Sequence, residues 1–181
     1  MNTRVHFAIH CVIGILALAV LGYAFSEPLA NLSINENNVN MSSDIYITQE
    51  CLSISAPSLG MPSATNKCGE LDSTFKPQMQ AIMGFVIALM VCVFLEFIGM
   101  NFGDVVSNVF GLIVLCLSVV VIILVSTLSH YTRGPTSYKL TNTSIVVLVV
   151  TSLLILFELC CNKLVHRAVM TPYRMISGKK A

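Results

Sequence analysis

Four long apolar stretches alternate with polar ones along the chain, at residues 5–25, 81–100, 105–128 and 144–164. The second, AIMGFVIALMVCVFLEFIGM, carries a single charge. As a helix that rises about 1.5 Å per residue, it is long enough to cross a hydrocarbon core of ~30 Å. The pattern therefore predicts four membrane-spanning helices. Residues 101–104 leave room only for a tight turn, so we expect the second and third spans to form an antiparallel pair.

The polar stretches between the spans predict two outer loops, at residues 26–80 and 129–143, and a tail at residues 165–181. Within the first loop, the segment DIYITQECLSIS at residues 44–55 alternates β-branched or aromatic residues with polar ones, which favours one strand or a loose hairpin. We therefore predict an all-α membrane protein of one domain, residues 1–181. It is a four-helix transmembrane bundle with a small, partly β outer loop.

A secretory signal peptide is the alternative interpretation of residues 5–25. Arg4 would supply its positive start, and Ala24, Phe25 and Ser26 would form a small-residue cleavage site. The apolar run is longer than the ~7–15 residues of a signal core, so we expect a retained span.

Composition supports a membrane protein with little chain left for a separate soluble domain. The chain of 181 residues is 55% hydrophobic and 10% charged, with a mean hydropathy of +0.81. Soluble domains have about 25% charged residues. The net charge is +1, and no run of Lys and Arg resembles a nucleic-acid patch. We therefore expect no nucleic-acid partner.

The distribution of basic residues predicts the orientation in the membrane. With cytoplasmic termini, the inner side holds Arg4, Lys163, Arg167, Arg174, Lys179 and Lys180, and the outer side holds Lys67, Lys76, Arg133 and Lys139. Glycosylation sequons agree, since those at Asn31 and Asn40 fall in the first outer loop. We expect a multi-pass protein of the secretory pathway, at the plasma membrane, with both termini cytoplasmic.

Each span has small or polar residues along one helical face, and such residues let membrane helices pack closely. In the second span they are Gly84, Ala88 and Cys92, in line with Glu96. The other spans carry His10, Gly14, Ala17 and Ala24; Asn108, Gly111 and Ser118; and Ser144, Thr151 and Glu158. A carboxylate is costly in lipid, so we expect Glu96 to face protein along its small-residue line.

Four polar residues lie at a similar depth, roughly 6–12 Å inside the cytoplasmic boundary. They are His10, Glu96, Asn108 and Glu158. One interpretation of this layer is structural, with the carboxyl groups satisfied by neighbouring polar side chains. The other is a protonation or ion-binding site, because two carboxylates in a dry site tend to share one proton.

The seven cysteines differ in their expected roles. Cys51 and Cys68 lie in the outer loop, where a disulfide closing a loop of about 18 residues would contribute ~3 kcal/mol. Cys11, Cys92 and Cys116 fall within spans, as small apolar side chains. Cys160 and Cys161 sit at the cytoplasmic end of the fourth span, a position typical of palmitoylation, although ordinary packing is the alternative.

The sequence offers no pattern typical of an enzyme. It lacks the Cys-x-x-Cys of quinone-linked membrane thiol oxidoreductases, a phosphate-binding glycine loop and a Gly-x-Ser-x-Gly elbow. The four histidines, His6, His10, His130 and His166, are scattered over both predicted membrane faces, and no His-x-x-x-His pair lies on a face that could share a metal with a third ligand. We therefore expect neither catalysis, nor a metal, nor a cofactor.

The whole layout resembles four-span proteins of the claudin, PMP22 and MARVEL types, with a first outer loop of about fifty residues, a minimal inner turn, a shorter second loop and a brief basic tail. The resemblance implies a role in cell junctions, membrane organisation or accompaniment of a larger complex. We expect a non-catalytic adhesion protein or auxiliary subunit that contacts other membrane proteins through its spans and outer loop. The alternative is an oligomeric ion channel or proton-coupled transport element using Glu96 and Glu158.

Overall fold

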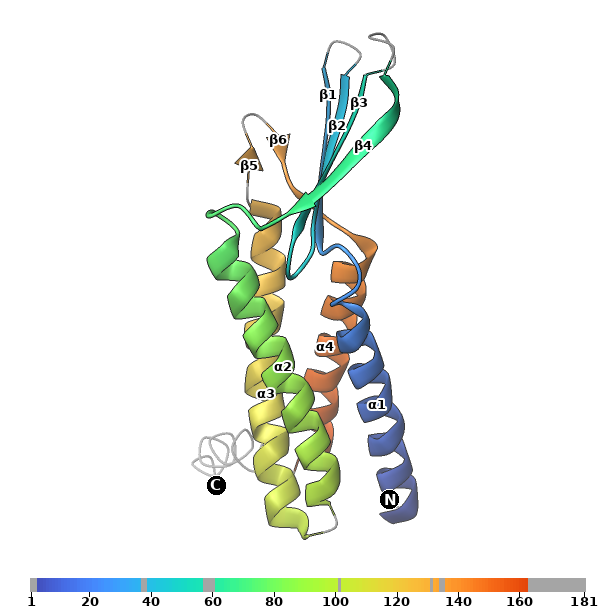
Figure 1. The fold of residues 1–181 in the computed structure, drawn as a ribbon. Helices are drawn as coiled ribbons and strands as arrows, with labels where there is room; N and C mark the ends of the chain where they lie inside the picture. The colour runs from blue at the N-terminus through green and yellow to red at the C-terminus, as the bar shows by residue number, and fades with distance from the viewer. Residues whose placement is uncertain are drawn as a thin grey trace, which may run out of the picture.

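The computed structural model describes residues 3–36, 39–56, 61–100, 102–130, 132–133 and 136–162. Within these ranges, long helices stand side by side, and an antiparallel sheet extends from one end of them (Figure 1). The predicted tail, residues 165–181, lies outside the described ranges. The chain is thus mostly helical, with a small sheet at one end.

The helices are α1 (Thr3–Tyr23), α2 (Lys76–Gly99), α3 (Asp104–Ser126) and α4 (Asn142–Cys161). A short 3₁₀ helix, η2 (Thr127–His130), continues α3. Helix α2 begins five residues before the predicted span at 81–100. Its first turn contains Pro77, and a proline is tolerated there because the first N–H groups of a helix have no partner within it.

Three helical segments are long and apolar enough to cross a membrane: Lys76–Gly99, Val105–His130 and Asn142–Cys161. Helix α1 is 21 residues long, and its apolar part among the described residues, Cys11–Tyr23, is shorter. The prediction of a multi-pass, helical membrane protein therefore agrees with the structure for three of the four expected spans.

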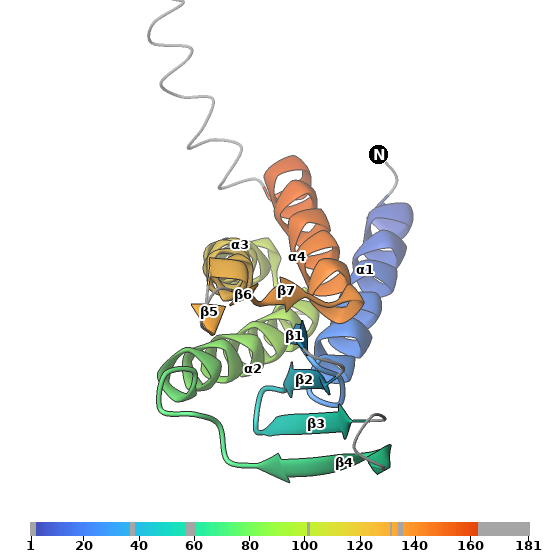
Figure 2. The same ribbon diagram turned by 90° about the horizontal axis from the view of Figure 1, so that it is seen from above.

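Seen along their axes, the helices form a ring in which α1 and α3 each pack between α2 and α4 (Figure 2). The contacts of α3 with α2 and α4 are extensive, and those of α1 are fewer. Large apolar side chains fill the centre, among them Leu21, Ile82, Leu89, Val121 and Leu154. Apolar side chains also cover the outside, which suits contact with lipid.

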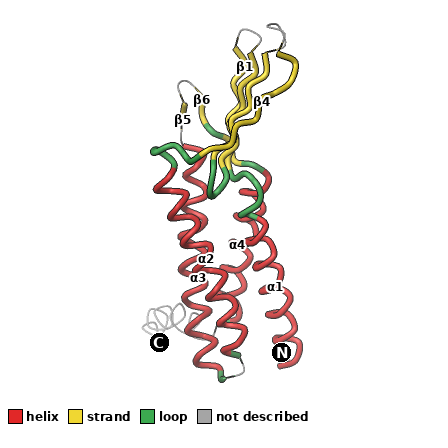
Figure 3. Tube along the Cα trace, viewed as in Figure 1, coloured by secondary structure: helices red, strands yellow, loops and turns green. Residues whose placement is uncertain are grey.

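The two predicted outer loops build one sheet (Figure 3). The first supplies β1 (Ala30–Glu36), β2 (Val39–Ile45), β3 (Glu50–Ala56) and β4 (Met61–Gly69), and the second supplies β7 (Lys139–Leu140). The strand order is β4-β3-β2-β1-β7, and every pair is antiparallel. The second loop also forms a two-stranded pair, β5 (Thr132–Arg133) and β6 (Thr136–Ser137).

The sequence predicted one strand or a loose hairpin at residues 44–55, whereas the first loop forms the four strands β1 to β4. The other strands resemble a loop in composition, because asparagine and serine are frequent on the second face of β1 and β2, and asparagine is depleted in strands. Along β1, Ala30 and Leu32 are buried, while Asn31 is half-buried and Ser33 is exposed. An amphipathic strand of this kind resembles a polar loop in composition and is identified by its period of two.

The buried face of the sheet rests on the end of the bundle from which both loops emerge. Leu29, Ile45 and Ile47 are almost completely buried there, and the rings of Phe75 and Tyr138 pack edge to face with centroids 4.9 Å apart. The Ser144 hydroxyl, at the start of α4, donates a hydrogen bond to the Leu29 carbonyl oxygen. The sheet is therefore attached to the bundle through both loops.

Candidate functional site

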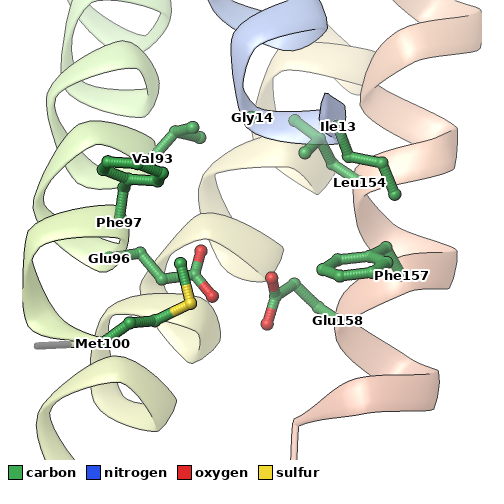
Figure 4. A pocket seen from close by; sticks show the side chains of 9 residues that line it. All are labelled: Ile13, Gly14, Val93, Glu96, Phe97, Met100, Leu154, Phe157 and Glu158. Carbon is green, nitrogen blue, oxygen red and sulfur yellow. The ribbon is translucent and has the colours of Figure 1, made fainter. Parts of the chain in front are cut away.

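The most unusual feature of the helical core is a pair of buried carboxyl groups at the end remote from the sheet. Glu96 on α2 is 6% exposed and Glu158 on α4 is 2% exposed. Their side chains point toward each other across the bundle (Figure 4). The prediction that Glu96 faces protein rather than lipid agrees with this burial.

A cavity with mostly apolar walls surrounds the pair (Figure 4). Helix α1 contributes Ile13 and Gly14, α2 contributes Val93, Phe97 and Met100, and α4 contributes Leu154 and Phe157. Among the described residues that line this cavity, none is basic. Two acids thus share an environment in which a negative charge is poorly solvated.

Asn162 holds Glu158 in place. Its side-chain amide donates to the Asn108 carbonyl oxygen over 2.8 Å and to Oε2 of Glu158 over 3.2 Å, which links the end of α4 to the start of α3. Sequence analysis missed Asn162, although a spacing of four residues places it on the same helical face as Glu158.

Gly111 provides the space that the Glu158 carboxyl group occupies. A Cβ atom at Gly111 would overlap Oε2 of Glu158 and would lie 2.6 Å from Nδ2 of Asn162. The carboxyl group therefore packs directly on the backbone of α3, where only glycine leaves room for it.

The predicted polar layer is brought together in part. Glu96 and Glu158 meet, and Asn108 is half-buried and contributes its backbone carbonyl to the cluster. The side chain of His10 lies outside the described residues, so its place in the layer stays a prediction.

The predicted packing line on α2 was wrong for Gly84, which is exposed and has nothing within 4 Å of where a Cβ would stand. Ala88 and Cys92 are only half-buried. The buried face instead carries larger side chains: Met79, Ile82, Val86, Leu89, Val93 and Glu96. Their alternating spacing of three and four residues is that of coiled-coil-like packing, in which large side chains interlock.

The polar lines predicted on α3 and α4 do face the core. Gly111, Ser118, Ser144 and Thr151 are buried. The hydroxyl groups of Thr151 and Ser144 do not bond one helix to another, however. Thr151 donates to the Val147 carbonyl oxygen of its own helix over 2.7 Å, and Ser144 bonds the segment before β1. These side chains contribute close packing more than interhelical hydrogen bonds.

The predicted disulfide joins Cys51 on β3 to Cys68 on β4. The two residues are direct partners in the strand register, with Cα atoms 4.0 Å apart. The other five cysteines are free. Of the pair proposed for palmitoylation, Cys160 is exposed and Cys161 is half-buried at the end of α4, and the modification stays a prediction.

The two predicted glycosylation sites lie on the polar face of the sheet in different settings. Asn31, in β1, is half-buried and pairs with Asp44 and Lys139 on either side; its side-chain amide donates to the Asp44 carboxylate. Asn40, in β2, is exposed. Space for a glycan is therefore greater at Asn40.

Neither a comparison with protein-family models nor one with curated proteins finds a match for this chain. Among the described residues, no group of three or more histidine, cysteine or acidic side chains is placed to hold a metal ion. The sheet and the Glu96–Glu158 pair are therefore the candidate functional features of the molecule.

Proposed function

We propose that this chain is a non-catalytic membrane protein that recognises another membrane or cell-surface protein through its outer sheet. The observation that carries the proposal is the construction of a single sheet from both outer loops, attached to the bundle by Ser144 and by the packing of Phe75 on Tyr138. Adhesion, membrane organisation or an auxiliary role in a larger complex would each use such a surface.

The free face of the sheet has the character of a recognition surface. It carries Asn31, Ser33, Asn40, Ser42, Asp44, Ser53 and Ser55, as the strand register and alternation require. Reversible protein interfaces are about as polar as other protein surface, so this composition suits a non-obligate partner. A sheet that is already ordered also loses little conformational entropy on binding.

The proposed topology has four spans with both termini cytoplasmic. As a helix of 21 residues, α1 extends about 31 Å, enough for the hydrocarbon core. The sheet would then face the cell exterior, where the Cys51–Cys68 disulfide suits the oxidising conditions. The layout shared with claudin, PMP22 and MARVEL proteins supports a plasma-membrane location by resemblance alone.

Epitope tags on the two termini test this topology. Both tags should bind antibody only after the plasma membrane is permeabilised, while a tag inserted at residues 57–60, between β3 and β4, should bind without permeabilisation. A terminal tag that is accessible in intact cells would contradict the four-span arrangement.

The recognition surface is tested by co-purification in mild detergent with two matched variants. Ser53→Arg/Ser55→Arg adds two positive charges to the polar face of β3, and Thr48→Arg/Gln49→Arg adds the same charge to the exposed turn before it. The first variant should lose the partners that wild-type protein retains, and the second should keep them. Equal recovery with both variants would contradict recognition through this face.

A second function, that of an oligomeric ion channel or proton-coupled element, is favoured by the buried side chains of Glu96 and Glu158, which point toward each other (Figure 4). Intramembrane carboxyl groups often mark ion pathways. Reconstituted protein should then conduct protons or cations, and the Glu96→Gln/Glu158→Gln variant should lose the flux while it still inserts. Absence of flux from wild-type protein would leave recognition as the function.

A further inference from the structure

The turn between α2 and α3, at the end of the bundle remote from the sheet, exposes large apolar side chains (Figure 1). Phe102 is 77% exposed and Val105 is 74% exposed, the two highest values among the large apolar side chains of the described residues. A turn that meets water is usually built from polar residues and glycine, and a group of exposed apolar side chains marks a surface that contacts something other than water.

Hydrogen bonds and close packing hold the tip of this turn in place. The backbone N–H groups of Phe102 and Gly103 donate to the Gly99 carbonyl oxygen over 2.9 Å and 3.1 Å. Gly103 adopts a φ of +129°, which side chains other than glycine rarely allow. A Cβ atom at Gly99 would lie 3.2 Å from Val106, so the two helices meet closely just before the turn. The exposure of Phe102 is therefore built into a defined turn.

The exposed tip continues the apolar outer surface of α3. Val105, Val109 and Leu112 are exposed at spacings of four and three residues, which places them on one helical face. Phe102 precedes Val105 by three residues. Helix α3 is long and apolar enough to cross a membrane, and this face is the one that would then contact lipid. The apolar side chains of the turn are thus continuous with the lipid-facing surface.

The lengths of α2 and α3 place the turn at the edge of the hydrocarbon. At the end near the sheet, α3 becomes polar from Ser126 onward and α2 is polar up to Gln80. The remaining helical residues, 105–125 in α3 and 81–99 in α2, extend about 31 Å and about 28 Å. Both lengths match a hydrocarbon core of ~30 Å. The two helices therefore agree that the second boundary of the core lies at the turn.

A charge limits how deep the turn can lie. The sequence places Asp104 directly after Gly103, and its side chain lies outside the described residues. A carboxylate is costly within hydrocarbon, so the turn reaches no deeper than the headgroups. Phenylalanine and other large apolar side chains enter the boundary between headgroups and acyl chains when a surface element lies at that level. Phe102 and Val105 are at this level.

We propose that the α2–α3 turn binds the lipid bilayer, with Phe102 and Val105 inserted between headgroups and acyl chains, and that this contact sets the depth of the helix pair. The occupant is lipid because the apolar surface of the turn continues the lipid-facing side of α3 and because both helix lengths end there. The inference requires that α2 and α3 cross the membrane. It depends on neither function proposed above.

Tryptophan fluorescence tests the location, because the chain contains no tryptophan and a single introduced one is the only reporter. Phe102→Trp is compared in lipid nanodiscs with Ser33→Trp, on the exposed face of β1, and with Phe94→Trp, 53% exposed on α2. Iodide quenches from water on both sides, and lipids brominated near to or far from the headgroup quench from the bilayer. Phe102→Trp should be quenched most by the shallow bromines and only weakly by iodide, Ser33→Trp by iodide alone, and Phe94→Trp by deeper bromines.

Iodide quenching of Phe102→Trp as strong as that of Ser33→Trp would place the turn in water and overturn the proposal. Absence of bromine quenching at Phe94→Trp would show that α2 does not cross the membrane, and would overturn the proposal together with the topology. If Phe102→Trp does not insert, Val105→Trp gives the same measurement with Phe102 intact.

The contribution of Phe102 to the depth is measured with the reporter at Val105→Trp. Adding Phe102→Ser should increase iodide quenching several-fold, because the turn loses its largest apolar contact with lipid. Adding Phe94→Ser, which removes an exposed aromatic ring from the middle of the lipid-facing surface, should leave iodide quenching unchanged. Equal quenching with and without Phe102→Ser would show that the helices alone set the depth, which would overturn the anchoring role.

Discussion

At the scale of single residues, the space and the hydrogen-bond partners around a polar side chain decide its role, as Glu158 and the two sequon asparagines show. Glu158 can lie deep in the core because Gly111 has no side chain and because Asn162 donates to it. Asn31 and Asn40 belong to identical kinds of sequon, yet one amide is engaged within the sheet and the other is exposed. Residue type alone predicts neither outcome.

Gly111→Ala should destabilise the protein by about 1–3 kcal/mol, since the new methyl group would displace the Glu158 carboxyl group from its seat. Gly84→Ala is the matched control, because nothing lies near its Cβ position and alanine favours a helix over glycine. Unfolding in mild detergent measures both. Equal stability of the two variants would show that the carboxyl group does not rest on α3.

We expect a glycan on Asn40 and none on Asn31. Asn40→Gln should increase the gel mobility of protein made in mammalian cells by one glycan, matching the effect of peptide N-glycosidase, whereas Asn31→Gln should leave it unchanged. The reason is that the Asn31 amide nitrogen already donates to Asp44 in a half-buried position. A mobility shift from Asn31→Gln would contradict this assignment.

At the scale of elements, α2 shows how two plausible packing faces compete. The small-residue line through Gly84 would allow close approach of backbones, but the helix buries the line of large side chains instead. On that line, Ile82, Leu89 and Glu96 recur every seven residues, so Glu96 continues a row of interlocking apolar side chains. Other rows of this span, such as Met83, Met90 and Phe97, are equally apolar, so the seven-residue spacing alone does not identify the buried face.

Leu89→Ala should cost about 2–5 kcal/mol, because Leu89 is fully buried and its truncation leaves a cavity. Ile87→Ala, two residues away on the exposed face, should change stability by less than about 0.5 kcal/mol. Thermal unfolding of both variants in the same detergent tests the orientation of α2. A larger loss of stability in Ile87→Ala than in Leu89→Ala would mean that another face of α2 is buried.

At the scale of the whole molecule, the sheet and the bundle form one unit whose junction lies around Tyr138. This side chain is 1% exposed, packs on Phe75 at the start of α2, and precedes the short strand β7 that pairs with β1. The loop between α3 and α4 therefore completes the sheet formed by the loop between α1 and α2. A polar surface supported in this way is suited to recognition, and the buried carboxyl pair lies at the opposite end of the bundle.

Tyr138→Phe should leave stability nearly unchanged, because the buried hydroxyl has no hydrogen-bond partner among the described residues. Tyr138→Ala should cost about 3 kcal/mol or more, since it removes the aromatic contact between sheet and bundle. Hydrogen exchange at β1 and β7, measured beside thermal unfolding, would locate the loss at the junction. An equal loss of stability in both variants would show that the Tyr138 hydroxyl has a hydrogen-bond partner.

The sequence by itself determined the helices that are apolar and long enough to cross a membrane, the polar segments between them and the Cys51–Cys68 disulfide, because these depend on local composition, length and cysteine position. It also indicated that Glu96 and Glu158 lie at one depth. Only the tertiary structure decided which face of α2 is buried, how both loops join one sheet, and how Gly111 and Asn162 enclose Glu158. Those features depend on which distant segments meet, and close packing of their side chains selects one arrangement among several that the local pattern allows.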